Sequence, residues 1–363
     1  MIRKVKEIKM MRQTRVIIFL VILAFIGLGG KVQAQVQAIV VEDTTFLRGT
    51  KLAAKLEWLE RNAESHNIYI VEVNANENIT SHRILEYKNT INITIILIGD
   101  ETNRTISLSS NGTMFTVKRN VTFILDNNIT LQGRNQNTDT MVKVDGGIFK
   151  MNDGATIIGN KGGNGVSVQG TFEMTGGTIL GNGTGVGVGF GTFIMNGGSI
   201  SENADRGVYV GANGYSTNTF IMNGGTISGN TGGGVYNDGN FTMTGGTISG
   251  NTASCGGGVY VVREFNMRGG TISNNTATEY GGGVYLNKSW NKFTKTGGTI
   301  TGYNSDIDNG NIVKDNNGVL ARRGHAVFVE ESGVGFGRKE QRRRESTAGS
   351  NVNLSRDNEE NWN

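Results

Sequence analysis

Short runs of alternating apolar and polar residues repeat along residues 148–301. Each copy begins with a run of the Phe-x-Met type, which a glycine turn separates from a second run of the Thr-Ile-Ser type. A variable, glycine-rich link then leads to a third run of the Val-x-Val type. Apolar residues at every second position predict three short strands in each copy. The copies begin at Phe149, Phe172, Phe193, Phe220, Phe241, Phe265 and Phe293.

The alternation also predicts which side chains face inward. In the first strand these are the Phe and Met side chains, in the second the central isoleucine, and in the third the two residues of the Val type. One copy cannot bury them alone, because they all lie on one side of a thin ribbon. Winding the copies into a coil stacks each strand on its counterpart at about 4.8 Å and builds a continuous apolar column.

Weaker versions of this pattern flank the clear repeats. Upstream, the segments INITIILIGD, VTFILDNNITLQG and MVKVDGG keep the rhythm of three strands, and downstream GHAVFV repeats the third strand. We therefore expect an all-β solenoid over residues 69–330, with its clear repeats at 148–301.

Residues 35–68 break the rhythm and predict an N-terminal cap with one short helix. Thr50 is in place for the N-cap of this helix. An open solenoid end exposes strand edges that invite pairing with another chain, so we expect the helix to cover that end. The alternative is a helix that binds a partner protein. The apolar face of the helix consists of Leu52, Leu56, Leu59 and Ala63.

The composition fits a sheet with few free edges. The chain has 56 glycines and no proline among its 363 residues. Proline lacks the N–H group that an interior strand donates to its neighbour, so a solenoid has little place for it. Glycine then supplies the turns.

The first 34 residues have the features of a secretory signal peptide. A basic start is followed by an apolar run from Val16 to Gly29 and by small residues before Gln35. The apolar run is shorter than the roughly 20 residues of a spanning helix, so we expect no membrane span in the mature chain. The predicted location is extracellular or the bacterial cell surface, with the periplasm as the alternative.

Removal of this peptide changes the sign of the net charge. It carries seven of the 35 Lys and Arg residues and one of the 31 Asp and Glu residues, which leaves 28 basic and 30 acidic residues. We therefore expect no nucleic acid partner. Cys255 is the single cysteine and cannot form an internal disulfide. Residues 331–363 are a charged tail, in which STAGSNVNLS is a candidate for a last partial coil.

The repeat resembles the right-handed parallel β-helix, or pectin-lyase-like, architecture. It is also similar to the secreted GGTISGN repeat proteins of host-associated bacteria, often called polymorphic-outer-membrane or adhesin-like repeats. The resemblance covers residues 148–301 most clearly and implies the solenoid fold. It does not imply one activity, because this architecture hosts enzymes, adhesins and phage fibres.

The outward positions of the first strand predict no catalytic site. Glycoside hydrolysis needs two carboxyl groups at roughly 5–10 Å, and no two carboxylates are adjacent in this row. His66, His82 and His325 are too scattered to predict a metal site, and we expect no cofactor. An enzyme of this fold would have to use carboxylates on the variable loops. The candidates are Glu202, Asp205, Asp238 and Glu279.

The outward positions of the third strand predict an aromatic row, with one ring in each coil. The rings could stack on one another and stiffen the sheet. They could also form a platform for a sugar or a polymer, since exposed aromatic rows serve recognition. The candidate binding residues are Tyr209, Tyr236, Tyr260, Tyr285 and Phe328.

Two further rows follow the second strand. Its outward Thr and Ser residues predict hydroxyl groups that hydrogen-bond across strands. The turn after it carries a row of asparagines, which we expect to satisfy backbone groups and to adopt left-handed conformations. These asparagines are Asn160, Asn182, Asn203, Asn230, Asn251 and Asn275.

Together these patterns predict a secreted or surface-displayed β-helix without catalytic activity. Its function would be adhesion, through binding of a polysaccharide or another host-surface ligand. The alternatives are a polysaccharide lyase or glycoside hydrolase, and a structural spacer that associates end to end.

Overall fold

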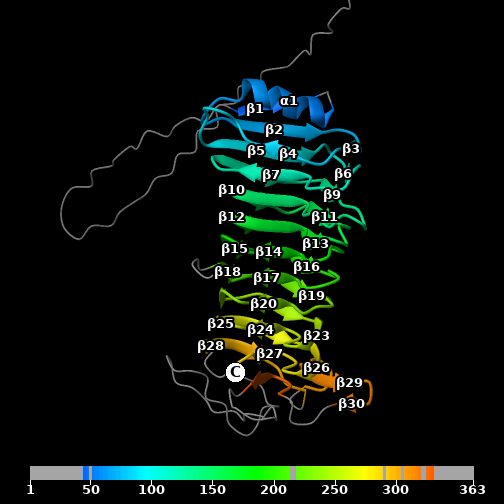
Figure 1. The fold of residues 1–363 in the computed structure, drawn as a ribbon, viewed down its shortest axis with the longest axis vertical. Coiled ribbons are helices and arrows are strands. Elements are labelled where there is room, and N and C mark those ends of the chain that lie inside the picture. The colour runs from blue at the N-terminus through cyan, green and yellow to red at the C-terminus, as the bar shows by residue number, and fades with distance from the viewer. Residues whose placement is uncertain are drawn as a thin grey trace, which may run out of the picture.

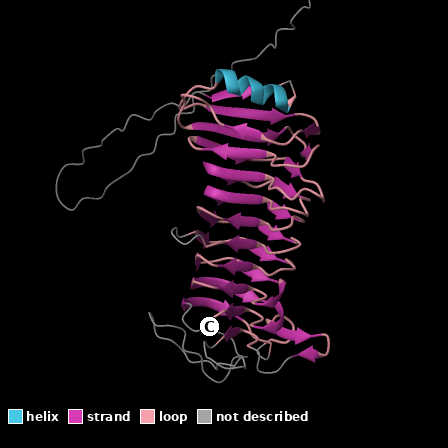
Figure 2. Cartoon of the chain, viewed as in Figure 1, coloured by secondary structure: helices cyan, strands magenta, loops and turns pink. Residues whose placement is uncertain are grey.

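The computed structural model describes residues 44–48, 51–212, 218–288, 292–303, 306–319 and 324–330. The predicted signal peptide, the N-cap candidate Thr50 and the charged tail at 331–363 lie outside these residues. The described chain forms a parallel β-solenoid, as predicted, with one short helix at its N-terminal end (Figures 1 and 2). Three strands in each turn pair in parallel with their counterparts in the next turn.

The first-strand stack begins with β1 (Thr44–Leu47), which pairs in parallel with the next strand of the stack. Its strands carry the Phe-x-Met runs in the clear repeats. They are β2 (Ile68–Val73), β5 (Ile93–Gly99), β8 (Val121–Leu125), β10 (Val142–Met151), β12 (Val166–Met174), β15 (Thr192–Met195), β18 (Thr219–Met222), β21 (Asn240–Met243), β25 (Glu264–Ser273) and β28 (Lys292–Ile300).

The second-strand stack carries the Thr-Ile-Ser runs, which in the last turns are the ends of β25 and β28. Its separate strands are β3 (Glu77–Ile79), β6 (Arg104–Leu108), β9 (Ile129–Gln132), β11 (Ala155–Ile158), β13 (Thr178–Leu180), β16 (Ser199–Ser201), β19 (Thr226–Ser228) and β22 (Thr247–Ser249).

The third-strand stack carries the Val-x-Val runs and includes the first halves of β10 and β12. Its separate strands are β4 (Arg83–Leu85), β7 (Phe115–Lys118), β14 (Val186–Val188), β17 (Val208–Val210), β20 (Val235–Asn237), β24 (Val259–Val261), β27 (Val284–Leu286) and β31 (Val327–Val329).

The inward rows lie as the alternation predicts. Ring centroids of successive phenylalanines from Phe149 to Phe293 are 4.5–5.0 Å apart. These rings and the isoleucines of the second strands are fully buried. Each such side chain contributes about 1.5–3 kcal/mol through burial. The column of stacked apolar rows therefore holds the turns together.

Helix α1 (Leu52–Asn62) covers the N-terminal end of this column, as predicted (Figure 1). Leu52, Leu56 and Leu59 are buried on the core. The N-cap residue is Lys51, whose side chain makes no capping bond. The first helical N–H instead donates to the carboxylate of Glu77 at 3.0 Å. A neighbouring turn thus supplies the cap.

The asparagine row forms a buried ladder, which extends the predicted row to Asn137 and Asn311. From Asn160 onward, each amide oxygen accepts hydrogen bonds from the asparagine of the preceding turn, as Asn251 does from Asn230 at 2.8 and 3.1 Å. The predicted left-handed conformation is wrong for these asparagines. The residue before each of the six predicted asparagines has the positive φ instead, and it is a glycine in most turns, such as Gly250 at 67°.

A second, smaller sheet was not predicted. It consists of β23 (Thr252–Cys255), β26 (Thr276–Tyr280), β29 (Ile312–Asp315) and β30 (Gly318–Val319). The links between the second and third strands lengthen in the last turns, and successive links pair in parallel from β23 to β29. This sheet lies at the C-terminal end of the described solenoid (Figure 1).

Candidate binding surface

The predicted aromatic row exists as one continuous register. Tyr209 pairs with Tyr236, which is followed in successive turns by Tyr260, Tyr285 and Phe328. The valines that flank Tyr209 in β17 point into the core and fix its side chain outward. Centroids of neighbouring rings are 4.9–5.9 Å apart. The row is therefore an aromatic ladder on the outer face of the third strands.

Only part of this row is accessible to a ligand. Tyr209 is 38 % exposed, whereas Tyr285 and Phe328 are buried. Tyr280 of the small sheet covers them, with its ring centroid 4.6 Å from that of Phe328. The Tyr285 hydroxyl donates to Glu330, and burial is the main cause that raises its pKa. Tyr285 and Phe328 thus belong to a core cluster. The accessible rings form the tyrosine strip, which consists of Tyr209, Tyr236 and Tyr260.

Tyr209 ends the ladder and has one ring face without an aromatic neighbour. The preceding turn has Gly187 in the same row, so no side chain stacks on that face from the register position. The amide nitrogen of Asn164 lies over Gly187, 2.8 Å from where a β-carbon would stand. This amide forms no side-chain hydrogen bond to the described residues. The end of the strip therefore combines a ring face without an aromatic neighbour with a side-chain amide at the next register position.

Phe190 adds a second exposed ring on the neighbouring turn. It lies two residues after β14 and is 59 % exposed, the highest exposure among the aromatic side chains described. Phe190 and Tyr209 are thus exposed aromatic side chains on consecutive turns. Sequence reasoning missed Phe190, because its glycine-rich context resembles the turns of other coils.

Charged groups surround the strip. The Arg206 guanidinium lies 4.8 Å from the ring centroid of Tyr236 and 5.7 Å from that of Tyr209, within the range of a cation–π contact. Its Nη1 also donates to Asp205 at 2.8 Å. Burial and then the charge of Asp238 raise the pKa of the Tyr236 hydroxyl, which remains a neutral hydrogen-bond donor at neutral pH. The surface thus offers rings, donors and acceptors together.

The outward hydroxyl rows of the second strands also lie in register. Thr226, Thr247 and Thr271 follow one another, and so do the serines two residues later. The predicted cross-strand hydrogen bonds are absent, because none of these hydroxyl groups bonds to another described side chain. They remain available to water.

Among the candidate loop carboxylates, two form ion pairs with arginines, and Glu279 lies exposed in β26 of the small sheet. Asp205 pairs with Arg206, and Asp238 lies 3.6 Å from the guanidinium of Arg263. His325 is buried and accepts a hydrogen bond from the Val313 N–H. No group of three His, Cys, Asp or Glu side chains in the described ranges is placed to hold a metal ion.

Glu202 occupies a turn position that favours glycine. Its φ is 55°, and the equivalent residue is Gly181 in the preceding turn and Gly229 in the next. A side chain costs about 1 kcal/mol in this left-handed region. We expect Glu202→Gly to raise the free energy of unfolding by about 0.5–1 kcal/mol, measured by urea titration. Gly229→Glu is the reciprocal control and should destabilise, whereas a loss of stability in Glu202→Gly would contradict the assigned turn geometry.

The described part of the chain contains no helix that is both long and apolar enough to cross a bilayer. Comparisons with protein-family models, with curated proteins and with solved structures found no match to this chain. The functional argument therefore depends on the surface of the solenoid itself.

Proposed function

We propose that this protein is a non-catalytic binding rod that attaches to carbohydrate on a host or environmental surface. The observation that carries the proposal is the end of the tyrosine strip, where Tyr209 has a ring face without an aromatic neighbour and Phe190 of the preceding turn is exposed. The apolar C–H face of a sugar ring packs well on such an aromatic face. The nearby amide of Asn164 and the guanidinium of Arg206 offer hydrogen bonds to hydroxyl groups.

The stacked rings of Tyr236 and Tyr260 have a different part in this proposal. Each of them has an aromatic neighbour on both sides, so their faces are closed to a ligand. They present ring edges and hydroxyl groups in a line that continues from Tyr209. A polysaccharide that lies along the rod would stack on Tyr209 and accept hydrogen bonds from the following hydroxyl groups.

The same proposal includes the location and the adhesin-like role. A rod that binds sugars outside the cell fits the predicted signal peptide, and a stiff solenoid would hold the strip away from its point of attachment. A polysaccharide lyase or hydrolase is less well supported, since Asp205 and Asp238 each pair with an arginine. A spacer without a ligand would not need exposed rings at one position.

Tyr209→Ser tests the proposal on an array of plant, bacterial and host glycans. We expect the variant to lose about tenfold in affinity for the glycans that the wild type binds, because an aromatic contact contributes about 0.5–1.5 kcal/mol beyond the area it buries. The fold should persist, since Ser167 occupies the same row two turns earlier. Unchanged glycan binding by Tyr209→Ser would overturn the assignment of the strip.

Ile148→Ser is the matched control. Ile148 is 39 % exposed, close to the value for Tyr209, and lies in the first-strand stack. The control should bind glycans as the wild type does. Equal losses in both variants would point to a general effect of exposed apolar side chains and would also contradict the proposal.

A further inference from the structure

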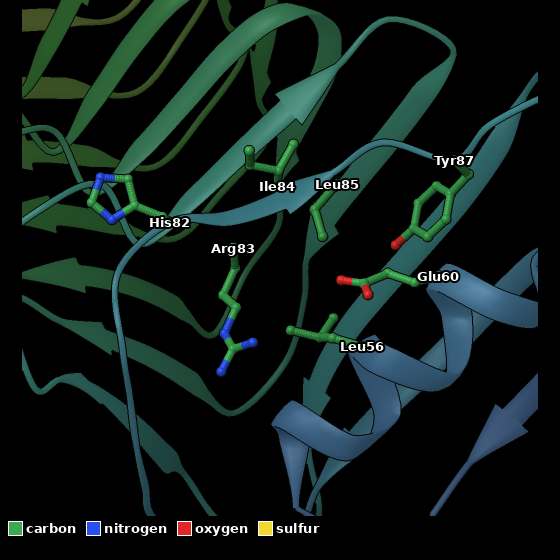
Figure 3. Close-up of a pocket in the computed structure, with 7 residues that line it drawn as sticks. All are labelled: Leu56, Glu60, His82, Arg83, Ile84, Leu85 and Tyr87. Atoms are coloured by element: carbon green, nitrogen blue, oxygen red, sulfur yellow. The ribbon is translucent and has the colours of Figure 1, made fainter.

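A cavity of about 220 Å³ lies between the capping helix and the first turn of the solenoid. Leu56 and Glu60 of α1 line one side, and residues 82–85 with Tyr87 line the other (Figure 3). The cavity is smaller than the roughly 300–1,000 Å³ of sites for drug-sized ligands. Its volume suits a ligand of the size of one sugar.

Arg83 stands in this cavity at a position that belongs to the core. In the third-strand register, Arg83 of β4 pairs with Phe115, and the next turns place Val142 and Val166 in the same row. All three of those side chains are fully buried. Arg83 itself is half-buried, with its Nε buried, so the side chain gives up apolar packing and is partly desolvated, which costs stability unless it is paired. The substitution therefore calls for a partner that this part of the chain does not provide.

The Arg83 side chain indeed lacks such a partner. Its Nε is buried without a hydrogen bond in the described structure, and its Nη2 has one long contact of 3.5 Å to the Thr80 hydroxyl. The carboxylate of Glu60 lines the same cavity, but no ion pair joins it to Arg83 among the described residues. The two opposite charges thus share a cavity without contact.

Tyr87 supplies a second unpaired group. It is only 9 % exposed, and its hydroxyl makes no hydrogen bond to the described residues. Figure 3 shows this hydroxyl and the Glu60 carboxylate both pointing into the space between the helix and residues 82–85. Burial is the main cause that raises the pKa of Tyr87, followed by the charge of Glu60, so the hydroxyl stays protonated. A ligand that accepts a hydrogen bond from this hydroxyl would give it a partner.

We propose that this cavity binds an acidic monosaccharide unit, such as a uronic acid. The carboxylate of the sugar would pair with Arg83, its hydroxyl groups would donate to Glu60 and accept from Tyr87, and its ring would pack on Leu56 and Leu85. A guanidinium matches a carboxylate in geometry and charge. A ligand that also carries donors would use the exposed Glu60 carboxylate at the edge of the cavity, whereas a simple inorganic anion would be repelled by it. The choice of a sugar over an amino acid rests on the proposed carbohydrate function.

Isothermal titration of the purified protein with D-glucuronate tests this site. We expect saturable binding of glucuronate and no detectable binding of D-glucose, because the neutral sugar lacks the carboxylate. Arg83→Val replaces the arginine by the residue of the following turns, so this variant should keep or raise the melting temperature while it loses at least about tenfold in glucuronate affinity. Glu60→Gln, on the exposed side of the helix, and Tyr87→Phe should weaken binding by smaller factors.

Lys143→Gln is the matched control, since Lys143 is a basic residue in the same stack but outside the cavity. It should bind glucuronate as the wild type does. Absence of glucuronate binding, equal binding of glucose, or undiminished binding by Arg83→Val would overturn the proposal, and preferential binding of L-serine would assign the cavity to amino acids instead. Tyr209→Ser should leave this titration unchanged, so failure of the cavity and failure of the tyrosine strip give different results.

Discussion

Replacing Ile248 by aspartate is expected to lower the free energy of unfolding by about 3–5 kcal/mol. Ile248 is fully buried in β22, between Ile227 and Ile272 of the neighbouring turns. An aspartate there must either keep an unpaired charge in the apolar column or become protonated at a cost in free energy. Thermal unfolding followed by far-UV circular dichroism measures the loss as a lower melting temperature.

Thr247→Asp is the control for this prediction. Thr247 precedes Ile248 in the same strand, but its side chain points outward and is partly exposed. A carboxylate there should change the free energy of unfolding by about 0.5 kcal/mol or less. If Ile248→Asp and Thr247→Asp destabilised the protein equally, the inward register of the second strands would be wrong.

Replacing Asn251 by alanine is expected to cost about 2–4 kcal/mol, because several buried groups lose their partners together. The amide oxygen of Asn251 accepts from the backbone and the side chain of Asn230. Its Nδ2 donates to the carbonyl of Ile227 at 3.0 Å and to the side chain of Asn275 at 2.9 Å. Urea titration at neutral pH measures the change.

Asn223→Ala is the control, because it removes an asparagine from an exposed row and not from the buried ladder. Asn223 also takes part in a row, since its Nδ2 donates to Asn196 at 2.8 Å, but this contact lies at the surface. Water can replace it, so we expect a loss of about 0.5 kcal/mol or less. A cost for Asn251→Ala as small as that for Asn223→Ala would show that the buried ladder does not stabilise the turns.

Alternation and repetition were sufficient to predict the solenoid, its inward rows and its cap. Phe241, for example, recurs with Met243 at the same spacing in neighbouring copies, and only a stack of turns buries both. The aromatic row followed from the same register. These features depend on contacts between equivalent residues of successive turns. Such contacts can be predicted directly from a repeated sequence, because equivalent positions of neighbouring copies pair with one another.

The features that the sequence left undetermined depend on residues outside the repeat. The burial of Tyr285 and Phe328 comes from Tyr280, which lies in a lengthened link and joins the small sheet. Arg83 could be placed in a core row only once β4 was aligned with Phe115, because its strand has three residues and lacks the Val-x-Val pattern. The burial of the last aromatic residues and the register of Arg83 therefore could not be predicted from the periodicity, because they depend on irregular links and terminal turns.

The most direct test of the proposed binding rod measures binding and turnover on the same glycan. The purified protein is first applied to a glycan array, and each glycan that it binds is then incubated with the protein and assayed for new reducing ends and for unsaturated products. We predict binding that Tyr209→Ser weakens, with no turnover by the wild type. Turnover by the wild type that disappears in Asp238→Asn or Glu202→Gln would contradict the account and identify the protein as an enzyme.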